Sequence, residues 1–194
     1  MTQLLLASKS PRRRELLGQL GLPVEYVDID VDETLTSPVA AEAVAETLAR
    51  RKAAGYTERI GDGQVLVTAD TVVVLEKRVL GKPRSRKEAA EMLQGLSGKA
   101  HQVYTGVCLR NDKELHSFTE CTHVSFRQLE GSEIDYYIDS YRPYDKAGAY
   151  GIQEWIGMVG IEHIDGCYYN VMGLPIARLY MELAQFTKKG GRCV

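Results

Sequence analysis

Three consecutive arginines of this 194-residue chain stand where packing alone would not place them. Arg12-Arg13-Arg14 follows Ser10-Pro11, a pair that is typical of a helix start. The first turn of a helix is electrostatically positive, so cations there are unfavourable unless an anion binds beside them. On a helical wheel, Arg13 falls within the apolar stripe and Arg12 at its edge. With Ser8 and the first-turn amides they predict a phosphate site, although a solvated arginine cluster also fits.

A further basic residue, Lys52, falls on an apolar helix face. A helix is predicted from Ser37-Pro38 to Ala54, and Val44, Leu48 and Lys52 are successive i+4 positions on it. A lysine there either extends its amine to solvent at the helix end or meets an anion. The opposite, solvated stripe is predicted to hold Glu42, Glu46 and Arg50.

Two groups of carboxylates could complement these cations. Asp70 interrupts an apolar β run over 65–75, where an unpaired charge would be costly, and Asp32-Glu33 follows another predicted strand. Lys82 lies in the Gly81-Lys82-Pro83 turn. Each residue alone fits a structural ion pair. Together, several cations and two or three carboxylates are typical of phosphoryl transfer with a hard divalent cation such as magnesium.

The composition excludes several classes of protein. The chain has 24 Lys plus Arg against 26 Asp plus Glu, which counts against a protein dedicated to binding duplex nucleic acid. No apolar run is long enough to span a membrane, and we expect a cytoplasmic protein. The cysteines form no CxxC pair and are expected to be free thiols, while the histidines lack zinc-ligand spacing.

Alternating strand and helix patterns predict a single α/β domain over residues 1–187, followed by a disordered tail over 188–194. Strands are predicted over 3–7, 24–29, 65–75, 101–109, 115–126 and 158–164. Helices are predicted from Ser10-Pro11 to a stop at Gly21, from Ser37-Pro38 to Ala54, and over 85–96, 132–141 and 174–184. The helix over 85–96 carries a capping box, Ser85 with Glu88. The last helix is predicted to bury Ile176, Leu179, Tyr180 and Leu183.

Several motifs resemble those of the Maf family of nucleoside triphosphate pyrophosphatases. They are Ala7–Leu17, Asp32-Glu33, Ala69–Val73, Gly81–Pro83, Leu96–Lys99 and Tyr168–Pro175. The segment Asp145–Gln153 resembles one branch of that family, the dTTP/UTP pyrophosphatases. The resemblance runs from about Leu4 to Leu183 in the order of the family's motifs.

This resemblance implies a fold, a reaction and a set of site residues. The fold would be Maf/Ham1-like (ITPase-like), an elongated mixed sheet flanked by helices with a substrate cleft. The reaction would be hydrolysis of dTTP and UTP, or of modified pyrimidine nucleotides, between the α and β phosphates. It would need a divalent cation, magnesium or manganese, and the protein would be a homodimer without a nucleic-acid or membrane partner.

The resemblance also assigns roles to individual residues. Asp70 would be the proton acceptor, and Asp70 with Glu33 would bind the metal. Substrate specificity would depend on Arg12, Thr71 and Gln153. Phosphate binding would fall to Ser8, Arg13, Lys52, Lys82 and Lys146. Two other classes of function fit the residues: a catalytically weak nucleotide-binding regulator of cell division, and an RNA-binding module that uses the arginine cluster.

Overall fold

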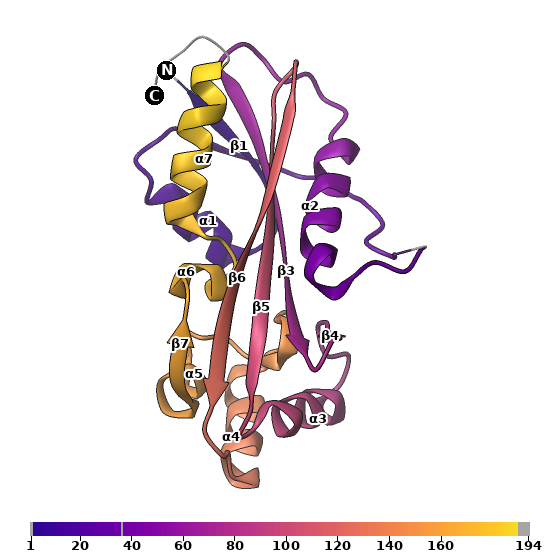
Figure 1. The fold of residues 1–194 in the computed structure, drawn as a ribbon, viewed down its shortest axis with the longest axis vertical. Helices are drawn as coiled ribbons and strands as arrows, with labels where there is room; N and C mark the ends of the chain where they lie inside the picture. Colours follow the sequence, from indigo (N-terminus) through magenta and orange to yellow (C-terminus); the bar gives the residue numbers. More distant parts are fainter. Residues whose placement is uncertain (1, 36, 190–194) are drawn as a thin grey trace. The chain divides into compact units, whose positions relative to one another are not determined.

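The computed structural model describes residues 2–35 and 37–189 (Figure 1). Within these residues a seven-stranded mixed sheet has the strand order β2-β1-β3-β5-β6-β7, and β4 pairs with β3. The chain divides into two compact units. Unit 1 comprises Met1–Asp70, Thr105–Glu120 and Gly173–Val194, and unit 2 comprises Thr71–Tyr104 and Cys121–Met172. No helix in the described part of the chain is long and apolar enough to cross a membrane.

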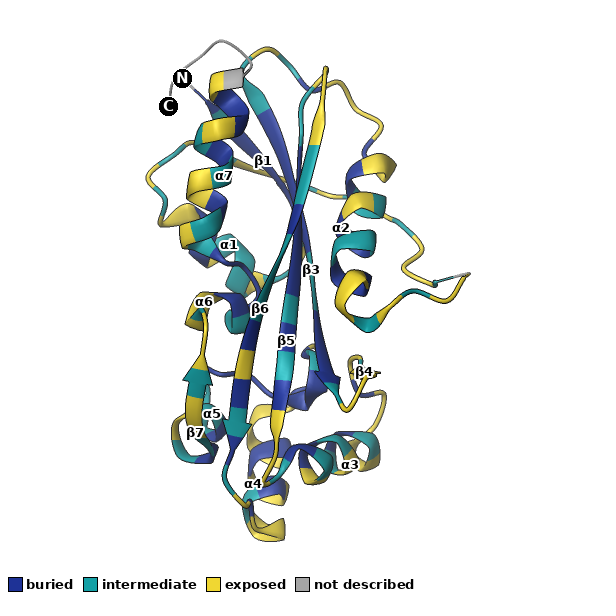
Figure 2. Ribbon diagram, viewed as in Figure 1, coloured by how far each residue is buried: buried dark blue, intermediate teal, exposed yellow. Residues whose placement is uncertain are grey.

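Unit 1 packs helices against strands in the order β2-β1-β3-β5-β6, with β3 in the middle. Its elements are β1 (Gln3–Ala7), α1 (Pro11–Gly18), β2 (Val24–Val27), η1 (Ala41–Ala43), α2 (Val44–Gly55), α7 (Ile176–Lys189) and parts of β3 (Gln64–Leu75), β5 (Ala100–Arg110) and β6 (Leu115–Phe126). β1 runs parallel to both β2 and β3. In Figure 1, α2 lies on one side of these strands and α1 and α7 on the other. The inward sides of these helices are buried (Figure 2).

The position of α2 is set by direct contact with the sheet. The Thr68 hydroxyl on β3 donates a hydrogen bond to the Ala49 carbonyl oxygen at 2.7 Å. A Cβ at Gly106 on β5 would lie 2.2 Å from the Glu46 nitrogen, so only glycine allows this approach. The predicted start of this helix at Ser37-Pro38 is wrong, because the first helical turn begins at Ala41 and the buried positions that hold the helix on the sheet begin at Val44.

Three other details of unit 1 differ from the prediction. Glu46 is not solvated, because its carboxylate accepts hydrogen bonds from Ser117 at 2.6 Å and Thr119 at 2.7 Å. Tyr180 on α7 is 49% exposed, whereas Leu179 is buried as predicted. The helix α7 continues through Lys189, so residues 188 and 189 of the predicted tail are helical, and 190–194 lie outside the described residues.

Unit 2 surrounds a core of aromatic and aliphatic side chains. Its elements are the end of β3, β4 (Arg78–Leu80), α3 (Arg86–Leu96), the start of β5, the end of β6, α4 (Gly131–Tyr141), η2 (Ala147–Ala149), α5 (Trp155–Gly160), β7 (Ile161–Asp165) and α6 (Tyr168–Met172). The core includes Leu93 and Leu96 of α3 and Tyr137 and Ile138 of α4. β7 pairs antiparallel with β6.

Unit 2 also departs from the predicted elements. The strand predicted over 158–164 is instead helix α5 through Gly160 followed by β7, and α6 was not predicted. β3, by contrast, spans Gln64–Leu75 and confirms the strand predicted over 65–75. At α3 the Ser85 hydroxyl accepts from the Glu88 amide, but the Glu88 carboxylate accepts from the Arg84 amide, so only half of the capping box forms.

His101 is a titratable residue within the core of unit 2. Its Nε2 lies 2.7 Å from the Tyr150 hydroxyl, its ring stacks on Phe126, and its Nδ1 is buried without a hydrogen-bond partner. Burial lowers the pKa of His101 to about 4. The unfolded chain protonates this residue near its ordinary pKa of about 6.5, so the folded state loses stability as pH falls from there toward 4.

We therefore expect a pH-dependent difference between the wild type and His101→Gln. Between about pH 7 and about pH 5, the unfolding free energy of the wild type should fall by about 2 kcal/mol more than that of the variant. Glutamine can bond to Tyr150 but does not titrate in this range. Urea denaturation, followed by the fluorescence of Trp155, the single tryptophan, measures the unfolding free energy of the wild type and of the variant at each pH. If the unfolding free energy of the wild type and of the variant decreases equally, His101 does not cause the pH dependence.

Candidate active site

Unit 1 brings together a lysine and two carboxylates that the sequence places far apart. Thr68 and Asp70 share one face of β3, because side chains alternate along a strand, and Ala49 and Lys52 lie one turn apart on α2. The hydrogen bond from Thr68 to Ala49 fixes this register. Lys52 Nζ lies 2.5 Å from Asp70 Oδ1 and 2.9 Å from Glu33 Oε1. The side chains of Lys52 and Asp70 are 14% and 13% exposed, so the anion predicted for Lys52 is this pair of carboxylates.

The loop that carries Glu33 is held by a residue that the sequence reasoning missed. Arg51 Nη1 donates to the carbonyl oxygens on both sides of Glu33, that of Asp32 at 3.1 Å and that of Thr34 at 2.6 Å. The Asp32 carboxylate accepts from the Thr34 amide at 2.8 Å, and hydrogen bonding to Thr34 lowers the pKa of Asp32. Asp32 therefore shapes the loop, while Glu33 reaches the lysine.

Arg13 is also anchored inside unit 1. Its Nε donates to the Gly173 carbonyl oxygen at 2.8 Å and its Nη1 to the Ala69 carbonyl oxygen at 2.9 Å. Burial lowers the pKa of Arg13, and the charge of nearby Asp70 opposes that shift. The guanidinium is thus held beside the residue that precedes Asp70. The fold therefore explains why a cation occupies the apolar stripe of α1.

Ser10 is the N-cap residue of α1, in agreement with the helix start predicted at Ser10-Pro11. The Ser10 side chain makes no capping hydrogen bond, and the Ser10 amide instead donates to the Ser8 hydroxyl at 3.2 Å. Arg14 donates to the Ser8 carbonyl oxygen at 2.9 Å and lies over the Tyr26 ring. Arg12 is half-buried in the first turn of α1. Ser8, Arg12 and Arg13 thus lie just before or within the first turn of this helix.

The donor set of unit 1 can be compared with the needs of a divalent cation. Within residues 2–35 and 37–189, no group of three or more His, Cys, Asp or Glu side chains is placed to hold a metal ion. Glu33 and Asp70 supply two carboxylates that share the Lys52 ammonium. Hard cations such as magnesium commonly bind through one or two carboxylates together with substrate phosphate oxygens and water. The residues therefore fit a cation that arrives with a phosphorylated substrate.

Unit 2 contains the remaining predicted site residues, Thr71, Lys82, Lys146 and Gln153. The Gly148 amide donates to the Gly81 carbonyl oxygen at 3.0 Å, which joins the loop over 145–154 to the turn that carries Lys82. Val73 packs against Gly148, and Thr71 shares the Val73 face of β3. The structure therefore places these residues on segments of unit 2 that contact one another.

Lys146 has partners that the sequence did not predict. Its side chain is 8% exposed, and its Nζ lies 2.7 Å from Asp145 Oδ1 and 3.0 Å from Glu154 Oε1. The other Glu154 oxygen accepts a hydrogen bond from the Tyr137 hydroxyl. Gln153 Oε1 is buried without a hydrogen-bond partner. Tyr137 and Glu154 meet because α4 packs against the loop, and no local sequence pattern links these two residues.

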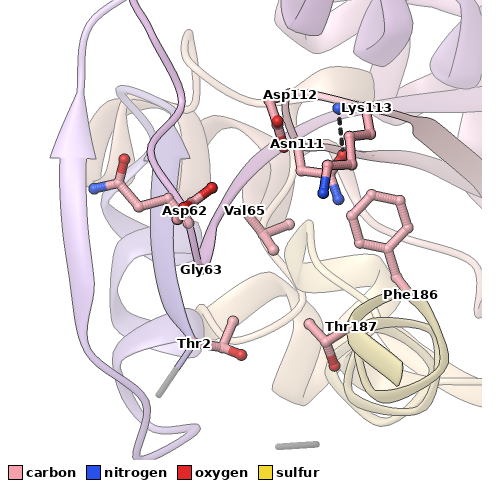
Figure 3. A pocket seen from close by; sticks show the side chains of 10 residues that line it. Thr2, Asp62, Gly63, Val65, Asn111, Asp112, Lys113, Phe186 and Thr187 are labelled. Atoms are coloured by element: carbon pink, nitrogen blue, oxygen red, sulfur yellow. Dashed lines mark hydrogen bonds between the residues drawn. The ribbon is translucent and has the colours of Figure 1, made fainter. Parts of the chain in front are cut away.

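A cavity elsewhere in unit 1 is separate from these residues. It has a volume of about 190 Å³ and lies between the loop at Asp62, the β5–β6 turn at Asn111 and the end of α7 at Phe186 (Figure 3). The described residues that line it include none of the predicted site residues. The candidate residues therefore form two clusters, one around Lys52 in unit 1 and one around Lys146 in unit 2.

Comparison with known proteins gives the family. A family model described as Maf-like protein matches residues 3–186. A dTTP/UTP pyrophosphatase of Bacteroides thetaiotaomicron is 51% identical over 184 residues, which cover 93% of this chain and 94% of the relative. A dTTP/UTP pyrophosphatase of Bacillus anthracis is 46% identical over 186 residues, which cover 96% of this chain and 96% of the relative. The Staphylococcus aureus Ham1 protein shares the fold, with a TM-score of 0.50, 14% identity and coverage of 98% of this chain and 100% of that one. The chain belongs to the Maf family.

Proposed function

We propose that this protein hydrolyses dTTP and UTP to the nucleoside monophosphate and pyrophosphate. The names of relatives that match nearly the whole chain support this reaction. The observation that carries the proposal is the cluster of Glu33, Lys52 and Asp70 in unit 1. A largely buried carboxylate fixed by an ammonium, beside a second carboxylate, suits proton transfer and charge neutralisation at a phosphate.

In this mechanism Asp70 accepts a proton from the water that attacks the α phosphorus. Lys52 fixes the Asp70 carboxylate by its 2.5 Å contact and counters the negative charge of Asp70 and Glu33. Arg13, held by two carbonyl oxygens, and the neighbouring Ser8 hydroxyl donate to phosphate oxygens, and Lys82 neutralises the pyrophosphate leaving group. Glu33 and Asp70 would hold a magnesium or manganese ion, which supplies neutralisation of the phosphate charge.

Base recognition falls to Gln153, with Arg12 and Thr71 as further specificity residues. The buried Gln153 Oε1 has no hydrogen-bond partner, so a ligand donor would satisfy it. Uracil and thymine present an imide N–H between two carbonyl groups, and a carboxamide can accept from the N–H and donate to a carbonyl. Cytosine lacks that donor.

Gln153→Glu should change the substrate preference. A carboxylate can accept from the imide N–H but cannot donate to the neighbouring carbonyl, so the kcat/KM ratio of UTP to CTP should fall about 10-fold or more. Rates of pyrophosphate release with both nucleotides measure this ratio. An unchanged ratio would remove Gln153 from the base pocket.

A panel of standard and modified nucleoside triphosphates tests the proposal. With magnesium or manganese, we expect pyrophosphate release to be fastest for dTTP, UTP or a modified pyrimidine relative. Nucleotide binding without pyrophosphate release would instead identify a regulator, and salt-dependent RNA binding would identify an RNA-binding module.

The proposal also includes a cytoplasmic homodimer in which residues 1–187 act as one domain. Sedimentation analysis measures the oligomeric state.

A further inference from the structure

The charge of Lys146 is already balanced inside unit 2. Two carboxylate oxygens lie within 3.0 Å of its Nζ, and only 8% of the side chain is exposed. Of the two carboxylates, Asp145 is exposed and Glu154 is largely buried, so a phosphate that displaced Glu154 would leave this carboxylate without its counter-ion in a largely buried setting. This arrangement suits a residue that holds structure better than one that meets a triphosphate.

Glu154 connects Lys146 to a buried hydroxyl on α4. One carboxylate oxygen contacts Lys146, and the other accepts from Tyr137, whose side chain is fully buried. Burial, followed by the hydrogen bond to Glu154, raises the pKa of Tyr137, so its hydroxyl keeps its proton and remains a donor. The same hydroxyl oxygen accepts from the Gly151 amide at 3.0 Å. Gly151 and Glu154 of the loop over 145–154 thus bond directly to Tyr137, and Lys146 is linked to it through Glu154.

The loop between these points is tightly constrained. Gly148 and Ala149 both have positive φ, 68° and 60°, and Ala149 is fully buried, so surrounding contacts must stabilise a conformation that alanine disfavours. A Cβ at Gly151 would lie 2.9 Å from Glu154 Cδ and 3.1 Å from Lys146 Cε. Gln153 stands directly before Glu154, and its buried Oε1 lacks a partner within this rigid segment.

We infer that Lys146, Glu154 and Tyr137 are positioning residues that orient the Gln153 carboxamide toward the base, and that Lys146 does not bind phosphate. This inference rests on the proposed function, because it assigns the determinant of pyrimidine selection at that site. A carboxamide free to rotate could present its NH₂ group to the N3 acceptor of cytosine. A fixed carboxamide presents Oε1 and favours the imide of uracil and thymine.

The test compares Tyr137→Phe, Glu154→Gln and Lys146→Met with the control Tyr136→Phe, whose tyrosine is 51% exposed on the same helix. Each network variant should lower the UTP-to-CTP ratio of kcat/KM by about 5-fold or more. The inhibition constant of inorganic tripolyphosphate, which has no base, should change by less than about 2-fold. The double variant with Lys146→Met and Gln153→Ala should have the same UTP-to-CTP ratio of kcat/KM as Gln153→Ala alone, because both substitutions act on the same contact with the base.

Other results would overturn the inference. If Lys146→Met raises the inhibition constant of tripolyphosphate by about 10-fold or more, this lysine is a phosphate ligand. An unchanged nucleotide ratio in Tyr137→Phe, which keeps the buried charge pair intact, would exclude the network from base selection even if the lysine variant fails to fold. If the wild type releases no pyrophosphate from UTP, the proposed function fails, and calorimetric affinities for UTP and CTP then test the network separately. If the ratio of the UTP affinity to the CTP affinity is the same in the wild type and in the network variants, the inference is wrong.

Discussion

Asp70→Asn is expected to lower kcat for UTP by about 10³-fold while the dissociation constant of the nucleotide changes by less than about 3-fold. Asparagine has nearly the shape of aspartate but cannot accept the proton of the attacking water. Lys52 keeps Glu33 as its counter-ion in the variant, so the cluster retains one ion pair. Single-turnover rates of pyrophosphate release and calorimetric binding measure the two quantities.

The matched control for this variant is Asp62→Asn. Asp62 belongs to the same unit but lines the separate cavity of Figure 3, away from the predicted catalytic residues. We expect its kcat to stay within about 2-fold of the wild-type value. If Asp70→Asn hydrolyses UTP at the wild-type rate, Asp70 is not the proton acceptor.

Lys52→Met should reduce both activity and stability. The change leaves the Glu33 and Asp70 carboxylates without their shared ammonium, and Asp70 is largely buried. We expect kcat/KM to fall by about 10²-fold and the unfolding free energy to fall by about 3 kcal/mol, since removing one partner of a buried ion pair leaves an uncompensated charge. Arg50→Met, on the exposed side of the same helix, is the control and should change neither quantity substantially.

A divalent cation should partly restore the stability of Lys52→Met. Two carboxylates without an ammonium attract a cation more strongly, and binding to the folded state alone raises the unfolding free energy. Thermal unfolding with and without magnesium should therefore show a larger stabilisation of the variant than of the wild type. Equal shifts would mean that Glu33 and Asp70 do not form the cation site, and an unchanged kcat/KM would remove Lys52 from the mechanism.

The sequence predicted the Lys52 cluster in part, because a charge on an apolar face or in an apolar strand needs a partner. The helical periodicity of 44, 48 and 52 identified Lys52 correctly, and Asp70 required a counter-ion that the structure supplies. The periodicity did not reveal that Lys52 and Asp70 pair with each other. That contact depends on how α2 lies across β3, which the Thr68 hydrogen bond and Gly106 determine.

The failures have a similar physical origin. Glu46 has the pattern of a solvated residue, but serine and threonine on β6 lie opposite it and bind its carboxylate. Arg51, Tyr137 and Glu154 act through partners on other segments, so local spacing carries no signal of their roles. The start of α2 was predicted from a local signal that packing overrides. The roles of Thr71, Lys146 and Gln153 came from resemblance to the family alone.

Hydrolysis of UTP in ¹⁸O-labelled water tests whether the attacking water reaches the α phosphorus. Attack of water at the α phosphorus places the labelled oxygen in uridine monophosphate and leaves the pyrophosphate unlabelled. Mass spectrometry of both products from the magnesium-supported reaction should therefore find the label only in the monophosphate. Label in pyrophosphate, release of orthophosphate in its place, or no hydrolysis of UTP and dTTP would contradict the proposed reaction.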